Sequence, residues 1–148
     1  MDIKAKDAYR VQFTQGIEQS AIQVLMTFYQ PLVYASGILV YLTLIAEAKN
    51  LHTLESHSRL LTLTNLESDV FDRACAKLEE YMLLRVYMKE GENRNTYIYV
   101  VQPPLQAIDF VSSKVYMNHY TKAVGQKQAE LSVSGILSGN IDVDHYDI

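Results

Sequence analysis

Histidine, cysteine and carboxylate side chains are the groups in this chain that could bind a metal ion or act as nucleophiles. His52 and His57 are five residues apart, so they do not share a helix face as metal-binding histidines four residues apart do. We expect both histidines to be exposed to solvent or to cap a helix. Cys75 lies between Ala74 and Ala76 on an apolar helix face, which predicts a small buried hydrophobic residue rather than a reactive thiol.

The segments that come nearest to known catalytic or ion-binding loops are incomplete. "DVDHYD" at 142–147 lacks the glycine and the closing glutamate of a calcium loop. "SVSG" at 132–135 lacks the first glycine of a nucleophile elbow. None of the six glycines has the sequence context of a phosphate-binding P-loop. The sequence therefore predicts no enzyme, no bound cofactor and no metal site.

The overall charge and the cysteine content narrow the classes of function. The chain has 148 residues, of which 49% are hydrophobic, and this suits one globular domain with a real core. Its net charge is −4, whereas a domain held to DNA chiefly by phosphate neutralisation is usually basic. The single cysteine excludes an intramolecular disulfide and fits a reducing compartment. We therefore expect a cytoplasmic protein.

A long uncharged segment occupies the first third of the chain. Residues 20–46 contain no charged side chain, and the strongly apolar part of this segment, Leu32–Ala46, is 15 residues long. A membrane-spanning helix needs roughly 20 apolar residues, and Pro31 interrupts the segment on its N-terminal side. The pattern predicts a buried central helix of a globular domain.

The N-terminal half is expected to form one strand and two helices. Tyr9, Val11 and Phe13 alternate with polar residues, which predicts a strand over 8–13. Helical spacing predicts one helix over 18–29 and, beginning at Pro31, another over 31–49. One face of the second helix carries Leu32, Ala35, Leu39, Leu42 and Ala46. Since the rest of its circumference is also mostly apolar, we expect it to be buried on several sides.

The following segment has the pattern of a helix-turn-helix and a hairpin. A short helix is expected over 53–65, and a longer one over 66–81 begins after a tight turn where Thr64 and Glu67 have capping-box spacing. Strands over 83–90 and 95–102 are joined by a turn within Glu90–Asn95, and a double proline ends the second strand.

These elements predict a mainly α protein with a small β-hairpin (α+β). The expected architecture is a winged helix with an extra N-terminal strand and helix and a C-terminal helix over 108–123. We expect residues 1–131 to form a winged-helix oligomerisation domain and residues 132–148 to be a linker or a weakly ordered tail.

In a DNA-binding protein of this fold, the helix over 66–81 would enter the major groove. Its charge opposes contact with DNA. Two basic residues minus five acidic residues give this helix a net charge of −3, and its N-terminal end carries Glu67 and Asp69 where bases would be contacted. Asp69 is expected to pair with Arg73 on the exposed face. A DNA-binding transcriptional regulator remains the alternative function. The residues that could contact nucleic acid are Arg73, Lys77, Arg85, Lys89, Arg94, Lys114, Lys122 and Lys127.

The strand over 8–13 and the last helix favour self-association. Because several helices separate this strand from the hairpin, it has few places to pair within one small domain, and an unpaired edge invites a strand from another copy. We expect a dimer or a dimer of dimers. The residues expected at the contact are Tyr9, Val11, Phe13, Phe110, Val115, Tyr116 and Tyr120.

Two segments carry a resemblance to a known family. "YQPL" at 29–32, and the "LLRVYMKE…YIY…PPL" pattern at 83–105, lie on either side of the expected helix-turn-helix. Together they resemble the N-terminal domain of the primosomal DnaB/DnaD family of Gram-positive bacteria, which includes replication initiation and membrane attachment proteins. The resemblance extends over residues 8–125.

The resemblance implies a non-enzymatic adaptor that helps to recruit and load the replicative helicase at origins and restart sites. It implies an oligomerising winged-helix domain, here as a homodimer or tetramer, and contacts with other primosome and helicase-loading proteins. DNA binding would be weak or would come from regions outside this chain. For the full-length protein the resemblance implies a cytoplasmic location with peripheral contact to the membrane.

Overall fold

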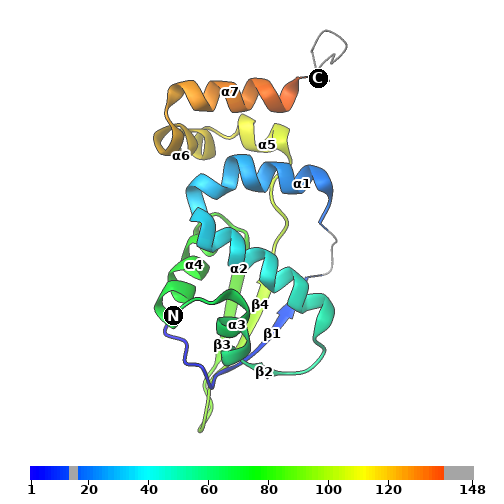
Figure 1. Ribbon diagram of the computed structural model, residues 1–148, viewed down its shortest axis with the longest axis vertical. Helices are drawn as coiled ribbons and strands as arrows, with labels where there is room; N and C mark the ends of the chain where they lie inside the picture. Colours follow the sequence, from blue (N-terminus) through cyan, green and yellow to red (C-terminus); the bar gives the residue numbers. More distant parts are fainter. Residues whose placement is uncertain (14–16, 139–148) are drawn as a thin grey trace, which may run out of the picture.

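The structure is a computed structural model that describes residues 1–13 and 17–138. A winged-helix body lies at one end, and a layer of C-terminal helices packs on the other end (Figure 1). In chain order the elements are β1 (Ala8–Gln12), α1 (Gln19–Val24), the π-helical turn η1 (Leu25–Tyr29), α2 (Gln30–Asn50), β2 (Glu55–Ser56), α3 (His57–Thr64), α4 (Ser68–Glu80), β3 (Leu84–Lys89), β4 (Thr96–Val101), α5 (Ala107–Ser112), α6 (Lys114–Val124) and α7 (Gln126–Leu137).

The sheet has the strand order β2-β1-β4-β3. The β3 and β4 strands form the expected antiparallel hairpin, and Lys89 pairs with Thr96 at its tip, so the predicted turn position is confirmed. The β1 strand pairs in parallel with β4 along its whole length and antiparallel with β2. The expectation that β1 has few places to pair within the domain is therefore wrong. The chain returns through four helices and β3 to place β4 beside β1, and no local sequence signal marks such a crossover.

The helix-turn-helix is present, but the turn differs from the one expected. Asn65 adopts a left-handed conformation (φ 57°) at the end of α3, where asparagine is better tolerated than most residues. The Thr64 hydroxyl donates to the carbonyl of Leu60 at 2.7 Å, and Glu67, the N-cap of α4, makes no side-chain capping bond. The expected capping box between Thr64 and Glu67 is therefore absent, because the Thr64 hydroxyl already has a partner in its own helix.

The central helix runs from Gln19 to Asn50 with two irregularities. One is the π-helical turn η1, and the other is a kink at Tyr34, whose φ of 68° and ψ of 171° are non-helical. The break expected at Pro31 is absent: the chain passes directly from η1 into α2, and Pro31 lies in the first turn of α2. This helix is long and apolar enough to cross a membrane, yet half of its apolar window is buried inside the domain.

Aromatic side chains join the C-terminal helices to the central helix. The ring of Phe28 lies 4.9 Å from the rings of both Phe110 and Tyr120, and Tyr29 meets Phe110 edge to face at 5.1 Å. The single helix expected over 108–123 is two helices, because Ser113 leaves the helical conformation and its hydroxyl caps α6 by accepting from the Tyr116 N–H.

The domain boundary expected after residue 131 falls inside α7, which continues to Leu137. Part of the predicted tail is therefore helical, and Ala129 of the same helix is buried in the core. Residues 139–148, including the incomplete calcium-loop pattern, lie outside the described residues.

Two buried polar networks tie the strands to the helices. Glu47 is 2% exposed and accepts hydrogen bonds from the Tyr9 hydroxyl (2.8 Å) and from two guanidinium nitrogens of Arg59 (2.9 and 3.0 Å). His57 is fully buried, and its ring nitrogens lie 2.7 Å from the Asp7 carbonyl and 2.6 Å from the Tyr99 hydroxyl. The expectation of an exposed or capping histidine is wrong for His57, because these partners allow the polar ring to be buried.

Candidate protein-interaction surface

The α2 helix is apolar on its solvent-facing side as well as on its buried side. Val33, Val40, Tyr41 and Leu44 of the buried side have no exposed surface. Apart from the adjoining η1, the elements that α2 contacts most are α4, α6 and β1. The opposite side carries apolar residues that no described part of the chain covers.

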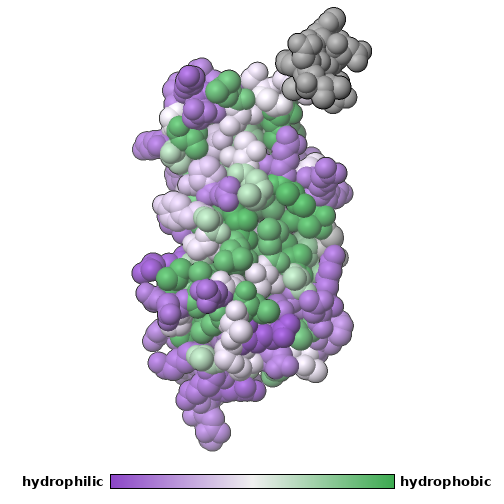
Figure 2. Space-filling model, viewed as in Figure 1, coloured by the Kyte–Doolittle hydropathy of each residue, from purple (hydrophilic) through white to green (hydrophobic). Residues whose placement is uncertain are grey.

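Four of these uncovered residues form a row that we call the α2 seam: Ala35, Leu39, Leu42 and Ala46. All four are exposed, and the side chains of Leu39 and Leu42 have exposed fractions of 41% and 38%. Their spacings of four, three and four residues place them along one line on a helix. Figure 2 shows apolar surface gathered over α1 and α2 across the middle of this face.

The α2 seam corrects the expected placement of the central helix. Sequence spacing put Ala35, Leu39, Leu42 and Ala46 on one face together with Leu32, and we expected the helix to be buried on several sides. Only Leu32 of this set is buried. In a helix that is apolar nearly all round, periodicity shows which residues share a face but cannot show which face is turned to the core.

A shallow groove runs beside the seam between α2 and α3. Its volume is about 420 Å³, and Leu39, Leu42, Ala46 and Leu63 line it together with the Arg59–Glu47 pair. Leu63 is 51% exposed and adds apolar surface from a second helix. Burial raises the pKa of the Glu47 carboxyl, but hydrogen bonds from Arg59 and Tyr9 outweigh it and hold this pKa below its ordinary value. The ion pair therefore adds no net charge to the groove.

The surface of α4 is acidic, and its cations are already paired. Arg73 lies 3.7 Å from Asp69, as expected from their spacing, and the Lys77 ammonium lies 3.1 Å from Glu80. The Lys77 ammonium also lies 5.5 Å from the centre of the Tyr34 ring. Pairing with Glu80 raises the pKa of Lys77. This arrangement offers little free positive charge to a DNA phosphate.

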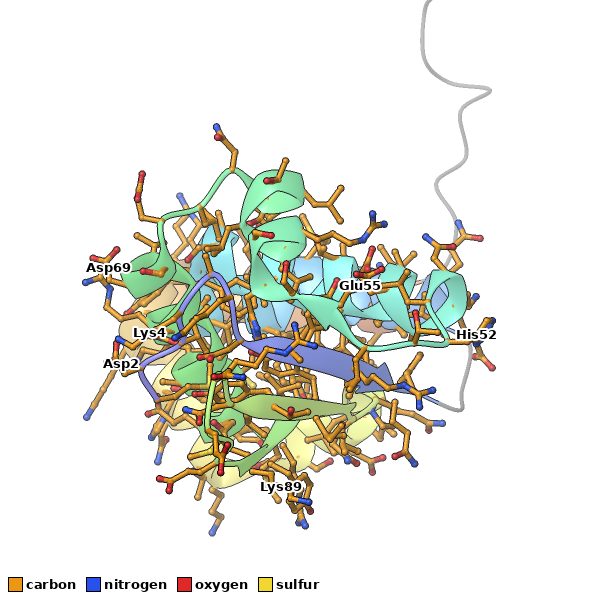
Figure 3. The ribbon with its side chains drawn as sticks, turned by 90° about the horizontal axis from the view of Figure 1, so that it is seen from below. Asp2, Lys4, His52, Glu55, Asp69 and Lys89 are labelled. Atoms are coloured by element: carbon orange, nitrogen blue, oxygen red, sulfur yellow. The ribbon has the colours of Figure 1, made fainter. Side chains whose placement is uncertain are left out.

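The other cations proposed for nucleic-acid contact are exposed but dispersed. Arg85, Lys89 and Arg94 belong to the β3–β4 hairpin, whereas Lys114 and Lys122 lie on α6 and Lys127 on α7, at the other end of the molecule (Figure 1). Seen from the hairpin end, Lys89 lies apart from Asp69, and side chains of both charge signs point outward around the molecule (Figure 3). These cations therefore do not form one continuous basic patch.

The residues expected at a self-association contact are mostly inside the domain. Tyr9 and Phe110 are fully buried, and Tyr120 is 2% exposed. Val11, Phe13 and Tyr116 are half-buried against the core. Val115 alone of this expected set is well exposed, at 63%. A contact between copies built on these side chains would require the domain to open, because they fill its own core.

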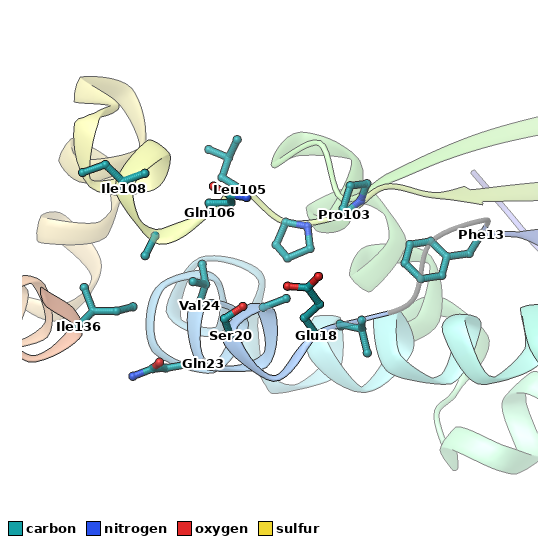
Figure 4. A pocket seen from close by; sticks show the side chains of 14 residues that line it. Phe13, Glu18, Ser20, Gln23, Val24, Pro103, Leu105, Gln106, Ile108 and Ile136 are labelled. Carbon is teal, nitrogen blue, oxygen red and sulfur yellow. The ribbon is translucent and has the colours of Figure 1, made fainter. Parts of the chain in front are cut away.

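A pocket lies where α1 meets the segment after β4 (Figure 4). It encloses about 500 Å³, and its walls include Val24, Pro103, Leu105 and Ile108. Among the described residues that line it, Glu18 is the single ionisable one. Within residues 1–13 and 17–138, no three His, Cys, Asp or Glu side chains are placed to hold a metal ion.

Cys75 is buried, as the sequence predicts. Burial raises the pKa of its thiol well above the ordinary value, and the nearby carboxylates of Asp72 and Glu79 add to this rise. The thiol is therefore unreactive. The burial of Glu47 was not predicted from the sequence, although this acid directly follows the uncharged segment, which was a signal that could have indicated it.

Two comparisons relate this fold to known proteins. The family model described as "DnaB N-terminal winged helix domain" matches residues 3–140. The crystal structure of the primosome protein DnaB (residues 1–300) from Geobacillus stearothermophilus has the same fold, with a TM-score of 0.86 and 26% sequence identity. That match covers 95% of this chain and 54% of the crystallised one, so the chain spans about half of its length. Both matches confirm the winged-helix fold class.

Proposed function

Because the chain belongs to the DnaB N-terminal winged helix domain family, we propose that it is a non-enzymatic assembly domain of a bacterial replication initiation and restart protein. In this proposal the domain self-associates, binds other primosome proteins, and so helps to load the replicative helicase. The match to a crystallised primosome protein supports the replication role.

The α2 seam and the uncharged segment around it are the observation that carries this proposal. Scattered exposed apolar residues are normal on protein surfaces, but a continuous apolar strip marks a protein or membrane contact. From residue 20 to residue 46 no charge interrupts this strip. Apolar surface that the domain leaves uncovered is available for burial against a protein partner.

The charge distribution supports protein contacts over DNA reading. A winged helix that reads DNA places its second helix in the major groove, and here that helix, α4, has Asp69, Glu79 and Glu80 exposed. These carboxylates would oppose the counterion release that provides most non-specific DNA affinity. The DNA-binding transcriptional regulator is therefore the weaker function.

We also propose a cytoplasmic protein whose membrane contact, in the full-length chain, is peripheral and does not use the α2 seam. Peripheral binding to anionic lipid combines apolar surface with a cluster of Lys and Arg. The uncharged segment from 20 to 46 offers no such cluster.

DNA binding is tested by titrating a labelled 20-base-pair duplex with the purified chain at about 150 mM salt, where specific readers usually bind at about 10⁻⁸ M or tighter. We expect weak, sequence-independent binding that disappears as salt rises. Tight, sequence-dependent binding that Arg73→Ala and Lys77→Ala both weaken would favour the transcriptional regulator.

The replication role is tested in cells by placing Leu39→Glu in the full-length protein and measuring the origin-to-terminus DNA ratio. We expect fewer initiations, because the carboxylate would be buried in an assembly contact. Ile108→Glu is the matched control, since Ile108 is 56% exposed on α5 and lies outside the seam. An unchanged ratio in a cell that depends on the Leu39→Glu protein would contradict the proposal.

A further inference from the structure

We infer that the α2 seam binds the α2 seam of a second copy of this chain, with the two helices antiparallel about a two-fold axis. The inference rests on the self-association part of the proposed function and adds to it a surface, a partner and an orientation.

The order of the residues in the seam favours an antiparallel orientation of the two helices. Read from either end, the seam is Ala, Leu, Leu, Ala with spacings of four, three and four residues. In an antiparallel pair related by a two-fold axis, Leu39 meets Leu42 of the other copy and Ala35 meets its Ala46. The two large side chains then lie at the centre, and the small side chains at both ends let the helix backbones approach closely. A seam with this symmetry is complementary to itself.

The absence of charge favours a second copy over a charged partner. A two-fold contact places each surface patch against its own copy, so any net charge in the patch would repel itself. No charged side chain lies between residues 20 and 46. Glu47 comes next along the helix, but it turns inward, and Arg59 neutralises it at 2.9 Å. Within residues 20–46 of the two helices, the contact therefore brings no pair of like charges together.

The length of the seam is set by the fold. Its first residue directly follows the kink at Tyr34, and its last directly precedes the inward-turned Glu47. At 1.5 Å per residue the seam spans roughly 17 Å of straight helix. Leu63 of α3 is 51% exposed beside it and widens the apolar surface that a second copy can cover.

The first test is the mass of the purified full chain by light scattering at tens of micromolar. We expect the mass of two chains for the parent protein and for Ile108→Glu, an exposed position outside the seam. Leu39→Glu and Ala35→Glu should each raise the dimer dissociation constant by at least about tenfold, because each buries an unpaired carboxylate in the contact. Circular dichroism and the thermal midpoint check that each variant is folded. If Leu39→Glu does not fold, Ala35→Glu, at an exposed position, tests the contact by itself.

The second test is disulfide formation between Ala35→Cys and Ala46→Cys proteins, one of which carries a short tag. The antiparallel pair predicts that the mixture forms the cross-linked heterodimer and that neither protein alone forms a disulfide at the same rate. A parallel pair predicts the reverse. Cys75, the single native cysteine, is buried and does not contribute.

The outcomes separate this inference from the proposed function. A dimer that Leu39→Glu and Ala35→Glu leave intact would overturn the inference and keep self-association by another surface. A monomeric parent at tens of micromolar would overturn both the inference and self-association, while the cell assay would still test contacts with other proteins. A monomeric parent that sediments with phosphatidylglycerol vesicles, and loses this binding with Leu39→Glu, would assign the seam to lipid.

Discussion

The imidazole of His57 and the hydroxyl of Tyr99 lie 2.6 Å apart, and both side chains are completely buried. The other ring nitrogen, Nδ1, lies 2.7 Å from the carbonyl oxygen of Asp7. A carbonyl can only accept, so Nδ1 carries the proton and Nε2 accepts from the Tyr99 hydroxyl. The neutral ring thus joins the start of α3 to β4 and to the residue before β1.

We expect this buried histidine to make stability depend on pH. Burial lowers the pKa of His57 below its ordinary value, and the hydrogen bond to Asp7 and the charge of its carboxylate oppose this only in part. The unfolded chain, with a histidine pKa of about 6.5, then binds the proton more readily than the folded protein. Stability is fully present above about pH 6.5 and falls as pH drops from there towards the lowered pKa, by at most about 1.4 kcal/mol per pH unit.

Urea denaturation between pH 5 and pH 8 measures this effect. His57→Gln should be less stable than the parent at pH 8, and its stability should depend less on pH between 5 and 6.5. His52→Gln is the matched control, because His52 is exposed, and it should keep the slope of the parent. The same slope in His57→Gln as in the parent would contradict the assignment.

The Tyr9 hydroxyl is expected to contribute stability through Glu47. It donates to the Glu47 carboxylate at 2.8 Å, and both side chains are buried. Tyr9→Phe removes the donor and leaves a carboxylate oxygen with one fewer partner, which should lower the free energy of unfolding by about 2 kcal/mol. Tyr87→Phe is the control, since Tyr87 is 54% exposed on the hairpin, and it should change stability little. Equal effects of the two substitutions in urea denaturation would disprove the role of Tyr9.

Local sequence signals predicted the elements whose partners are close in the chain. The hairpin could be predicted because two runs rich in Tyr, Val and Ile flank a polar turn and a double proline ends the second run. The parallel pairing of Ala8 with Thr96 could not, since it joins residues far apart in sequence and no turn marks it. The break between α5 and α6 had a readable signal in Ser113, a good N-cap residue.

The residues of the candidate site were grouped correctly from the sequence, but they were expected to face the core. Spacing grouped Ala35, Leu39, Leu42 and Ala46 correctly, yet only the structure shows that they face solvent. A protein-interaction surface and a core face are built from the same residues, so their pattern alone does not distinguish them. The absence of charged residues from 20 to 46 was the one feature of the sequence that indicated an apolar solvent-facing side on this helix.

Phe110 should hold the C-terminal helices on the central helix. Its ring is fully buried between Phe28, Tyr29 and Tyr116, at centre-to-centre distances of 4.9, 5.1 and 5.3 Å. Phe110→Ala should lower the free energy of unfolding by about 3–5 kcal/mol, because it leaves a cavity among these rings. Hydrogen exchange should quicken most in α5–α7. Ile108→Ala, at a 56% exposed position on the same helix, should stay within about 0.5 kcal/mol of the parent.

We predict that glycine at position 34 gives a more stable protein than alanine, although this position lies inside a long helix. Its φ of 68° and ψ of 171° lie in a region that essentially only glycine occupies without strain, and such strain costs on the order of 1–3 kcal/mol. Its side chain is 56% exposed, and the centre of its ring lies 5.5 Å from the Lys77 ammonium. At an exposed site this cation–π contact stabilises the protein by at most about 1 kcal/mol.

Tyr34→Gly and Tyr34→Ala both remove the ring and its contact with Lys77, so they differ mainly in backbone strain. We expect Tyr34→Gly to be the more stable of the two by about 1 kcal/mol or more in urea denaturation, because glycine adopts this conformation freely. The same pair of substitutions at Ser36, within the regular part of α2, should give the opposite order, since glycine in a helix interior is about 1 kcal/mol less stable than alanine. If alanine is the more stable residue at both positions, the backbone at Tyr34 is helical in solution and the kink that begins the α2 seam is absent.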